Sequence, residues 1–144
     1  MMAVELTAVA QQTVASGGNV LFTETAIPCN RGYVVHRNGA GVITLRGITN
    51  NCFARYKVAF FGNIGLPVGV ATQPIGISIT INGEPVPAST AIITAPAASL
   101  ENVATSIIID VPKGCCYTIA VRNVSDPATP ITVANANLMI DRVA

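Results

Sequence analysis

The segment Ile75–Ile81 constrains the fold more than any other, because isoleucine occupies every second position in it. Glycine, serine and threonine occupy the positions between. A period of two is typical of a β-strand with one buried and one exposed face. Asn82 and Gly83 follow directly, and this pair favours a tight turn because both residues tolerate positive φ. The segment is therefore predicted to be one strand of a hairpin.

Similar segments, rich in Val, Ile and Thr, recur between turns that contain glycine or proline, and helical periodicity is nearly absent. Such segments are predicted to be strands. They span residues 19–27, 33–37, 42–46, 53–61, 90–94, 103–111, 117–123 and 131–143. Eight to ten short antiparallel strands with no helix between them predict an all-β domain. A sandwich, a jelly roll and a barrel are the alternatives.

Two of these segments show further features: one has two distinct faces, and the other has a shift in its alternation. One face of residues 53–61 carries Ala54, Tyr56, Val58 and Phe60, and the opposite face carries Phe53, Arg55, Lys57, Ala59 and Phe61. In the last segment the apolar positions shift parity between Val133 and Leu138. That shift predicts a β-bulge near residues 135–137, since one extra residue moves every later side chain to the other face.

Residues 1–18 stand apart from this pattern. Residues 4–14 mix polar and apolar side chains, which suits either an edge strand or a detached arm, and Ser16-Gly17-Gly18 would serve as a hinge. We therefore predict a division into an N-terminal arm or edge strand at residues 1–18 and a β-domain at residues 19–144.

Charge is scarce. Lysine, arginine, aspartate and glutamate make up 10% of the chain, against about 25% in an ordinary soluble domain. Charges this sparse leave large apolar areas on a domain of this size, which monomers rarely expose. We therefore expect part of the surface to be covered by another copy of the chain. The net charge of +1 and the lack of a basic cluster give no electrostatic case for nucleic acid.

A membrane span and an export signal are not expected either. The longest stretch without charge, residues 58–83, contains Pro67, Pro74 and five glycines, which do not suit a spanning helix of about 20 residues. Residues 1–15 contain Glu5 but no basic residue and no sustained apolar run, so a secretory signal is not indicated.

Two turns suggest a family. Residues 77–88, ISITINGEPVPA, place an alternating strand before Asn-Gly-Glu-Pro, and residues 111–121, VPKGCCYTIAV, place Pro-Lys-Gly before another strand. With the opening strand GNVLF at residues 18–22, these steps resemble the tumour necrosis factor-like jelly rolls, which include complement heads, and most of all their bacterial and phage branch. The resemblance covers about residues 18–143. It implies a jelly-roll sandwich that assembles as a homotrimer.

The chain departs from this family at several points. Cys115 replaces the usual acidic residue after Lys-Gly, and aromatic residues are sparse, with no Trp, three Tyr and four Phe. No collagen-like Gly-X-Y stalk precedes the domain. The missing stalk argues against a spore filament and favours a freestanding trimer.

The resemblance implies a non-enzymatic structural protein. We expect a phage virion component, such as a capsid decoration or head-fibre protein, that is made in the host cytoplasm and has a virion lattice as its partner. In the family, strands carrying apolar positions reach the threefold axis. This makes four residues candidates for the trimer interface, although they could equally fill the sandwich: Tyr56, Phe60, Tyr117 and Leu138.

The N-terminal segment is the candidate docking arm for the lattice, through four apolar residues: Val4, Leu6, Val9 and Val14. Such an arm can add a strand to a neighbouring sheet. Two other functions stay open. One is a bacterial surface or spore-coat module, and the other is a fibre tip that binds a carbohydrate or a receptor.

The four cysteines do not predict a metal site. Cys115 and Cys116 are adjacent, and neighbouring residues of a strand point to opposite faces, so they do not suit one zinc ion. A disulfide between Cys29 and Cys52 is one alternative. The favoured interpretation is that the thiols are small buried residues in a reducing cytosol.

No catalytic constellation accompanies the single histidine, His36. The chain has no G-x-S-x-G elbow, and its seven carboxylates are scattered singly rather than paired. We interpret His36 as a residue that forms a structural hydrogen bond or a protomer contact. An enzymatic function and a cofactor are therefore not expected.

Overall fold

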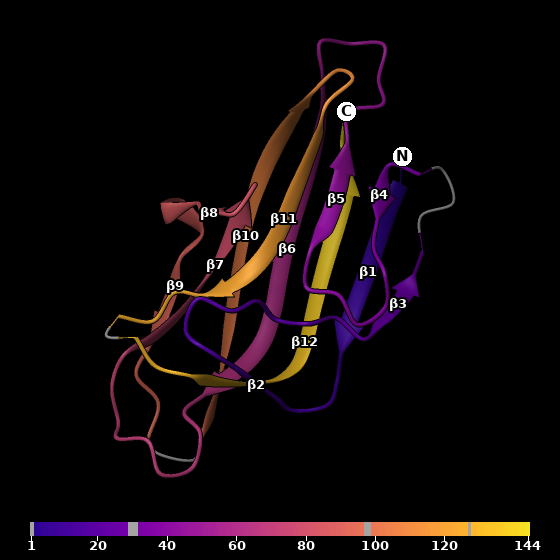
Figure 1. Cartoon of the computed structure of the whole chain (residues 1–144). Helices are drawn as coiled ribbons and strands as arrows, with labels where there is room; N and C mark the ends of the chain where they lie inside the picture. The colour runs from indigo at the N-terminus through magenta and orange to yellow at the C-terminus, as the bar shows by residue number, and fades with distance from the viewer. Residues whose placement is uncertain (1, 29–31, 97–98, 127) are drawn as a thin grey trace.

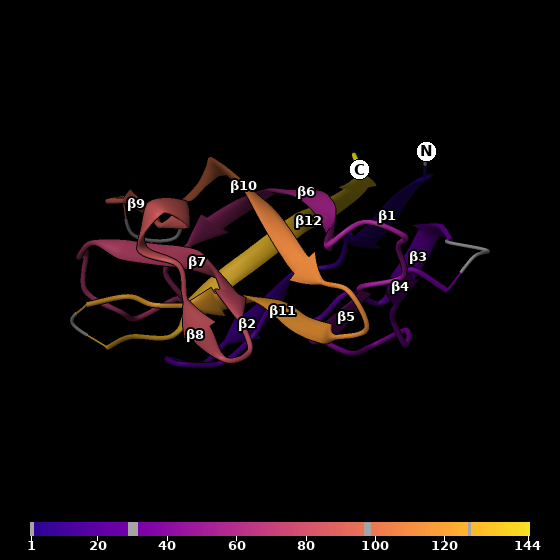
Figure 2. The same cartoon turned by 90° about the horizontal axis from the view of Figure 1, so that it is seen from above.

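The computed structural model describes residues 2–28, 32–96, 99–126 and 128–144, and it places them in two sheets packed face to face (Figure 1 and Figure 2). The strands are β1 (Met2–Ala8), β2 (Gln12–Val14), β3 (Glu24–Ile27), β4 (Val34–Val35), β5 (Ile43–Arg46), β6 (Phe53–Gly65), β7 (Ile75–Ile81), β8 (Glu84–Pro85), β9 (Ala91–Ile93), β10 (Leu100–Pro112), β11 (Cys116–Asn123) and β12 (Ile131–Arg142). A short 3-10 helix, η1 (Pro87–Ser89), lies between β8 and β9. Within these ranges no helix is long and apolar enough to cross a membrane.

Successive long strands alternate between the two sheets. Sheet A has the order β10-β6-β12-β1-β3, with β2 also paired to β12, and sheet B has the order β4-β5-β11-β7-β8, with β9 also paired to β7. Every pair is antiparallel. This alternation of strands between two sheets is the jelly-roll arrangement. The prediction of an all-β jelly-roll sandwich is confirmed, and the described residues add several very short strands to the eight to ten expected.

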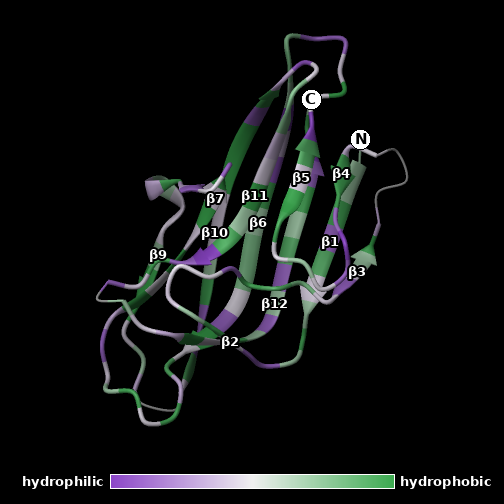
Figure 3. Ribbon diagram, in the orientation of Figure 1, coloured by the Kyte–Doolittle hydropathy of each residue, from purple (hydrophilic) through white to green (hydrophobic). Residues whose placement is uncertain are grey.

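The core lies between the sheets and follows the alternation of the sequence. On β6, Ala54, Tyr56, Val58 and Phe60 are fully buried between the sheets. Bands of hydrophobic and hydrophilic residues alternate along β1 and β5 (Figure 3). The predicted bulge in β12 is confirmed, because the register with β6 shifts between Ala134 and Asn137 and Asn135 has a φ of 53°.

β7 differs from its prediction in one respect. Its Asn82-Gly83 turn is confirmed, with φ angles of 51° and 86°, but the strand is buried on both faces rather than one. After the turn the chain folds back, so that β8 pairs with one end of β7 and β9 with the other. Ser89 fills the gap between them: its Oγ accepts a hydrogen bond from Ile79 N at 2.9 Å and donates one to Val86 O at 2.7 Å.

β1 is neither a detached arm nor an edge strand, the two alternatives predicted for residues 1–18. β1 is hydrogen-bonded between β12 and β3 inside sheet A. Val4, Leu6 and Val14 are 3%, 0% and 3% exposed, so they belong to the core, and Val9 is the member of the predicted arm that faces solvent. The physical reason is the alternation of Val4, Leu6 and Ala8 with polar or small residues, which is the pattern of an ordinary half-buried strand.

Candidate functional site

The face of sheet A that points away from the core presents three rows of side chains, each crossing β10, β6, β12 and β1. Residues paired across antiparallel strands point to the same side of the sheet. We call these residues the outer face. The rows are Ile108-Lys57-Asp141-Ala3, Ser106-Ala59-Met139-Glu5 and Ala104-Phe61-Asn137-Thr7.

Large apolar side chains lie exposed on the outer face. Phe61, Met139 and Ile108 are 44%, 41% and 65% exposed. They come from three neighbouring strands: Phe61 and Met139 are diagonal neighbours on β6 and β12, and Ile108 lies on β10 in the row of Lys57. Single exposed apolar residues are ordinary, but a contiguous group of them marks a surface that contacts another macromolecule.

The outer face is hollowed beside β10. A depression of about 450 Å³ is lined by residues of the outer face, including Lys57, Phe61 and Ser106, and on its other side by Ala88 of η1 and Thr90, which follows η1. An apolar or partly polar projection of another molecule can enter such a depression. The face is therefore shaped for a partner rather than flat.

Charged groups lie along one end of the outer face. Lys57 is the cross-strand partner of Asp141. One residue pair further along, Arg55 forms a bidentate ion pair with Asp110, with Nε–Oδ1 and Nη2–Oδ2 distances of 2.7 and 2.9 Å. These hydrogen bonds hold the pKa of the Asp110 carboxyl below its ordinary value. An apolar centre with charges at its margin is the usual arrangement of a protein–protein interface.

The predicted interface residues lie elsewhere. Tyr56, Phe60 and Leu138 are 0%, 0% and 1% exposed inside the sandwich, and Tyr117 packs against the same core. The hydroxyl of Tyr56 donates to Arg46 O at 2.6 Å and is held there. Tyr56, Phe60 and Leu138 therefore fill the sandwich, the alternative also given for them, and the predicted subunit contact is wrong for these three. Tyr117 is only partly buried, so its predicted contact stays a prediction.

The sequence alone indicates which face of β6 is exposed. The alternation on β6 separates a purely apolar set from a set that includes Arg55 and Lys57. Charged side chains are almost never fully buried, so the set that shares their face must be the exposed one. Phe61 belongs to that set together with Phe53, and the sequence analysis assigned neither aromatic residue a role.

The described cysteines differ from one prediction. Cys52, Cys115 and Cys116 are exposed free thiols, so the interpretation of buried thiols is wrong for these three. Cys29 lies outside the described residues, and the predicted Cys29–Cys52 disulfide therefore stays a prediction. Lys113 N donates to Cys52 O at 2.9 Å and Gly47 N donates to Cys115 O at 2.8 Å, which places these two cysteines on adjoining loops at one end of the sandwich. Within the described part of the chain, no three His, Cys, Asp or Glu side chains gather as a metal site.

His36 forms the structural hydrogen bonds expected of it. Its Nδ1 lies 3.0 Å from Thr25 Oγ1 and its Nε2 lies 3.1 Å from Ala40 O. Thr25 belongs to β3 of sheet A, and His36 follows β4 of sheet B. The imidazole therefore ties together the two sheets at their β3 and β4 edges.

Comparison with known proteins supports the fold. No protein-family model matches the chain, and no curated protein matches it. Among solved structures, the globular domain of the zebrafish complement 1qA protein is similar, with a TM-score of 0.64 and 9% identity over 99% of this chain and 97% of that one. Rabbit GITRL is similar over 77% of each chain, with a TM-score of 0.46 and 15% identity. The first of these likenesses shows that the sandwich has a jelly-roll fold similar to that of the complement 1qA globular domain.

Proposed function

We propose that this chain is a non-enzymatic structural protein that assembles with two further copies of itself through the outer face of sheet A. One observation carries the proposal: Phe61, Met139 and Ile108 lie exposed together on neighbouring strands. Fully burying one such side chain contributes roughly 1.5–3 kcal/mol. Three per subunit supply enough apolar area to begin a stable association.

The number of copies comes from the likeness in fold and from the family resemblance of the sequence. The complement-head jelly roll is the architecture with which this chain aligns over 99% of its length, and the family that the sequence resembles is trimeric. A closed ring of three copies buries a heterologous surface on every subunit, so that no apolar face is left open.

The setting that we propose is a bacteriophage particle. In it the trimer is a capsid decoration or head-fibre protein, made in the host cytoplasm and carried on the virion. The resemblance of the sequence to the bacterial and phage branch of the family supports this setting. Because β1 is part of sheet A, the lattice would contact a loop-bearing end of the sandwich rather than an N-terminal arm.

Light scattering on the purified chain tests the assembly. We expect a mass about three times 14.8 kDa. The Phe61→Lys variant, which places a charge beside Met139 in the apolar part of the outer face, is expected to be monomeric and folded. Val68→Lys is the matched control, since Val68 is 91% exposed and lies outside the outer face. A monomeric wild-type chain would contradict the proposal.

A separate experiment tests the setting. Particles released from cells that encode the chain are purified by density, and their proteins are identified by mass spectrometry. We expect peptides of this chain to sediment with the capsid protein. Their absence from particles that contain every other virion protein would remove the phage role and leave the self-association intact.

A further inference from the structure

A second concave site lies at the end of the sandwich where the loop between β5 and β6 stands beside the C-terminal end of the described chain (Figure 1). Its volume is about 410 Å³, within the range of small-molecule sites, about 300–1,000 Å³. We call it the end site. Its lining includes Tyr33, Thr49, Asn50, Asn51, Arg142 and Ala144, and none of these residues belongs to the outer face.

Arg142 is fixed at the end site. Its guanidinium lies 4.4 Å from the ring centroid of Tyr33 and 5.7 Å from that of Tyr56. Nη2 donates to Ile48 O at 2.6 Å and Nε donates to Ala144 O at 2.9 Å. A side chain held in this way loses little further conformational freedom when a ligand binds, so the site is preorganised.

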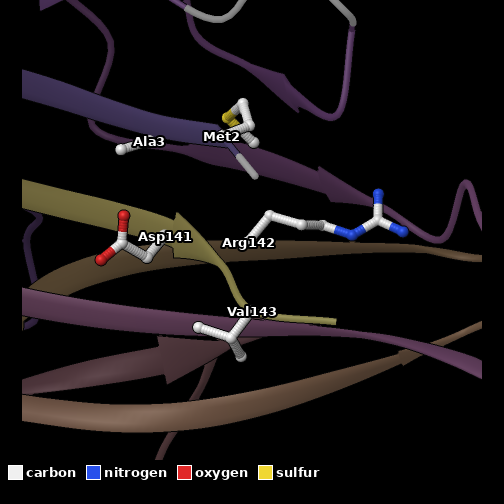
Figure 4. A pocket seen from close by; sticks show the side chains of 5 residues that line it. All are labelled: Met2, Ala3, Asp141, Arg142 and Val143. Carbon is white, nitrogen blue, oxygen red and sulfur yellow. The ribbon is translucent and has the colours of Figure 1, made fainter.

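Arg142 also keeps unused hydrogen-bonding capacity. Its Nη1 is buried and has no hydrogen-bond partner among the described residues. Figure 4 shows a different pocket, which shares Arg142 with the end site, and in it the guanidinium extends away from the carboxylate of the neighbouring Asp141. A buried donor without an acceptor costs free energy, and an acceptor from a bound ligand or an ordered water would remove that cost.

The remaining lining is rich in neutral hydrogen-bonding groups. The side-chain amides of Asn50 and Asn51 form no hydrogen bond with any described residue, and each offers two donors and one acceptor. Thr49 Oγ1 accepts from Asn51 N at 3.1 Å, which leaves its own O–H free to donate. No Asp or Glu side chain of the described residues lines the site.

We propose that the end site binds a sugar residue. The hydroxyls of a sugar both donate and accept hydrogen bonds, which matches the two amides, the Thr49 hydroxyl and the guanidinium. The apolar C–H groups of the sugar ring can pack against the part of the Tyr33 ring that lines the site and that Arg142 leaves uncovered. Because every lining residue belongs to one chain, the inference does not depend on self-association. A trimer would display three such sites and gain avidity for a repetitive glycan.

An array of neutral and acidic mono- and oligosaccharides tests this inference, followed by NMR titration with the monosaccharide that corresponds to the strongest signal. We expect the double variant Asn50→Ala/Asn51→Ala to bind that sugar at least tenfold more weakly. Both residues are exposed, so the variant should fold normally. Gln11→Ala removes an exposed amide outside the end site and is expected to bind as the wild type does.

The monomeric Phe61→Lys variant separates this inference from the proposed assembly. It should keep the wild-type affinity for the monosaccharide while its signal on a dense glycan array falls. If the wild-type chain binds sugar but proves monomeric, the sugar-binding inference is supported and the proposed self-association is contradicted. An array without any bound glycan, or unchanged affinity in the double alanine variant, would overturn the end site.

Discussion

Arg55 and Arg142 lie at the same end of sheet A but form different interactions. Arg55 is partly exposed and is paired with Asp110, whereas Arg142 is held by main-chain oxygens and by two tyrosine rings. In a chain with 10% charged residues, each charge has few alternative partners. A substitution that removes one charged side chain should therefore affect only the interactions which that side chain forms.

The Arg55–Asp110 pair predicts a pH-dependent contribution to stability. The pKa of Asp110 is lowered in the folded state, first by its hydrogen bonds to Arg55. A lowered carboxyl pKa stabilises the fold above the ordinary Asp pKa, about 3.9, and the contribution is lost as pH falls through the folded value. Asp110→Asn should therefore lower the melting temperature slightly at pH 7, and the difference from wild type should shrink as the pH falls below the ordinary Asp pKa. A difference that stays constant as the pH falls would contradict this role.

The exposed thiols predict rapid chemical modification. In the Cys29→Ser variant, all three remaining cysteines should react with a colourless aromatic disulfide reagent without denaturant, because Cys52, Cys115 and Cys116 face solvent. The released thiolate is counted by absorbance. Fewer than three equivalents before unfolding, rising to three afterwards, would show that one of these thiols is bonded or covered.

At the scale of the strands, the alternation of apolar residues predicts most of the sheet structure. β7, the bulge of β12 and the Pro112-Lys113-Gly114 turn follow from local pattern, because a period of two and a positive φ are properties of a few consecutive residues. The position of β1 does not follow from its own residues. Whether a half-buried strand lies at an edge or between two neighbours depends on pairing with β12, more than 120 positions away in the chain.

The same limit applies to the candidate sites. Alternation on β6 separates two faces, and the charged residues on one of them identify it as the exposed face, so the apolar centre at Phe61 was accessible to sequence reasoning. The end site was not. It joins Tyr33, the loop at residues 48–51 and Arg142, and no local pattern relates these three segments.

The interior position of β1 predicts that truncating Leu6, within β1, destabilises the fold far more than truncating Val9, just after it. Leu6 is 0% exposed and Val9 is 67% exposed. Leu6→Ala should lower the free energy of unfolding by about 2–5 kcal/mol because it leaves a cavity in the core. Val9→Ala should change it by less than about 0.5 kcal/mol. Urea denaturation of both variants measures the change in the free energy of unfolding. Equally small changes in the two variants would support a detached arm instead.

The Ser89 hydroxyl is predicted to stabilise β7 by accepting a hydrogen bond from a main-chain N–H of that strand. Ser89 is 0% exposed, and its Oγ accepts from Ile79 N where neither β8 nor β9 pairs with the strand. Ser89→Ala leaves that N–H buried without an acceptor, which should cost about 1–3 kcal/mol. Ser16→Ala, at an exposed position, is the control. Hydrogen exchange should also show faster exchange at Ile79 in the Ser89 variant, and unchanged protection there would contradict the assignment.

At the scale of the whole molecule, the scarcity of charge and the outer face have one common explanation. The chain exposes 7028 Å² and carries eight basic and seven acidic residues, which is roughly one charge per 470 Å², comparable with the largest apolar patch of a typical monomer. The outer face is where the exposed apolar side chains adjoin one another across strands. Covering it in an assembly leaves the end site and the loops as the surface that meets other molecules.

The response of the assembly to salt follows from this arrangement. Raising the salt concentration from 0.1 to 1 M shortens the screening length from about 10 to about 3 Å, which weakens associations between exposed charges but not the burial of Phe61, Met139 and Ile108. The mass by light scattering should therefore be the same at both concentrations, and sulfate should strengthen the association. Dissociation at 1 M salt would instead assign the contact to the charged end of the face, where Lys57 lies opposite Asp141. In that case Lys57→Glu, rather than Phe61→Lys, would be the variant that yields the monomer.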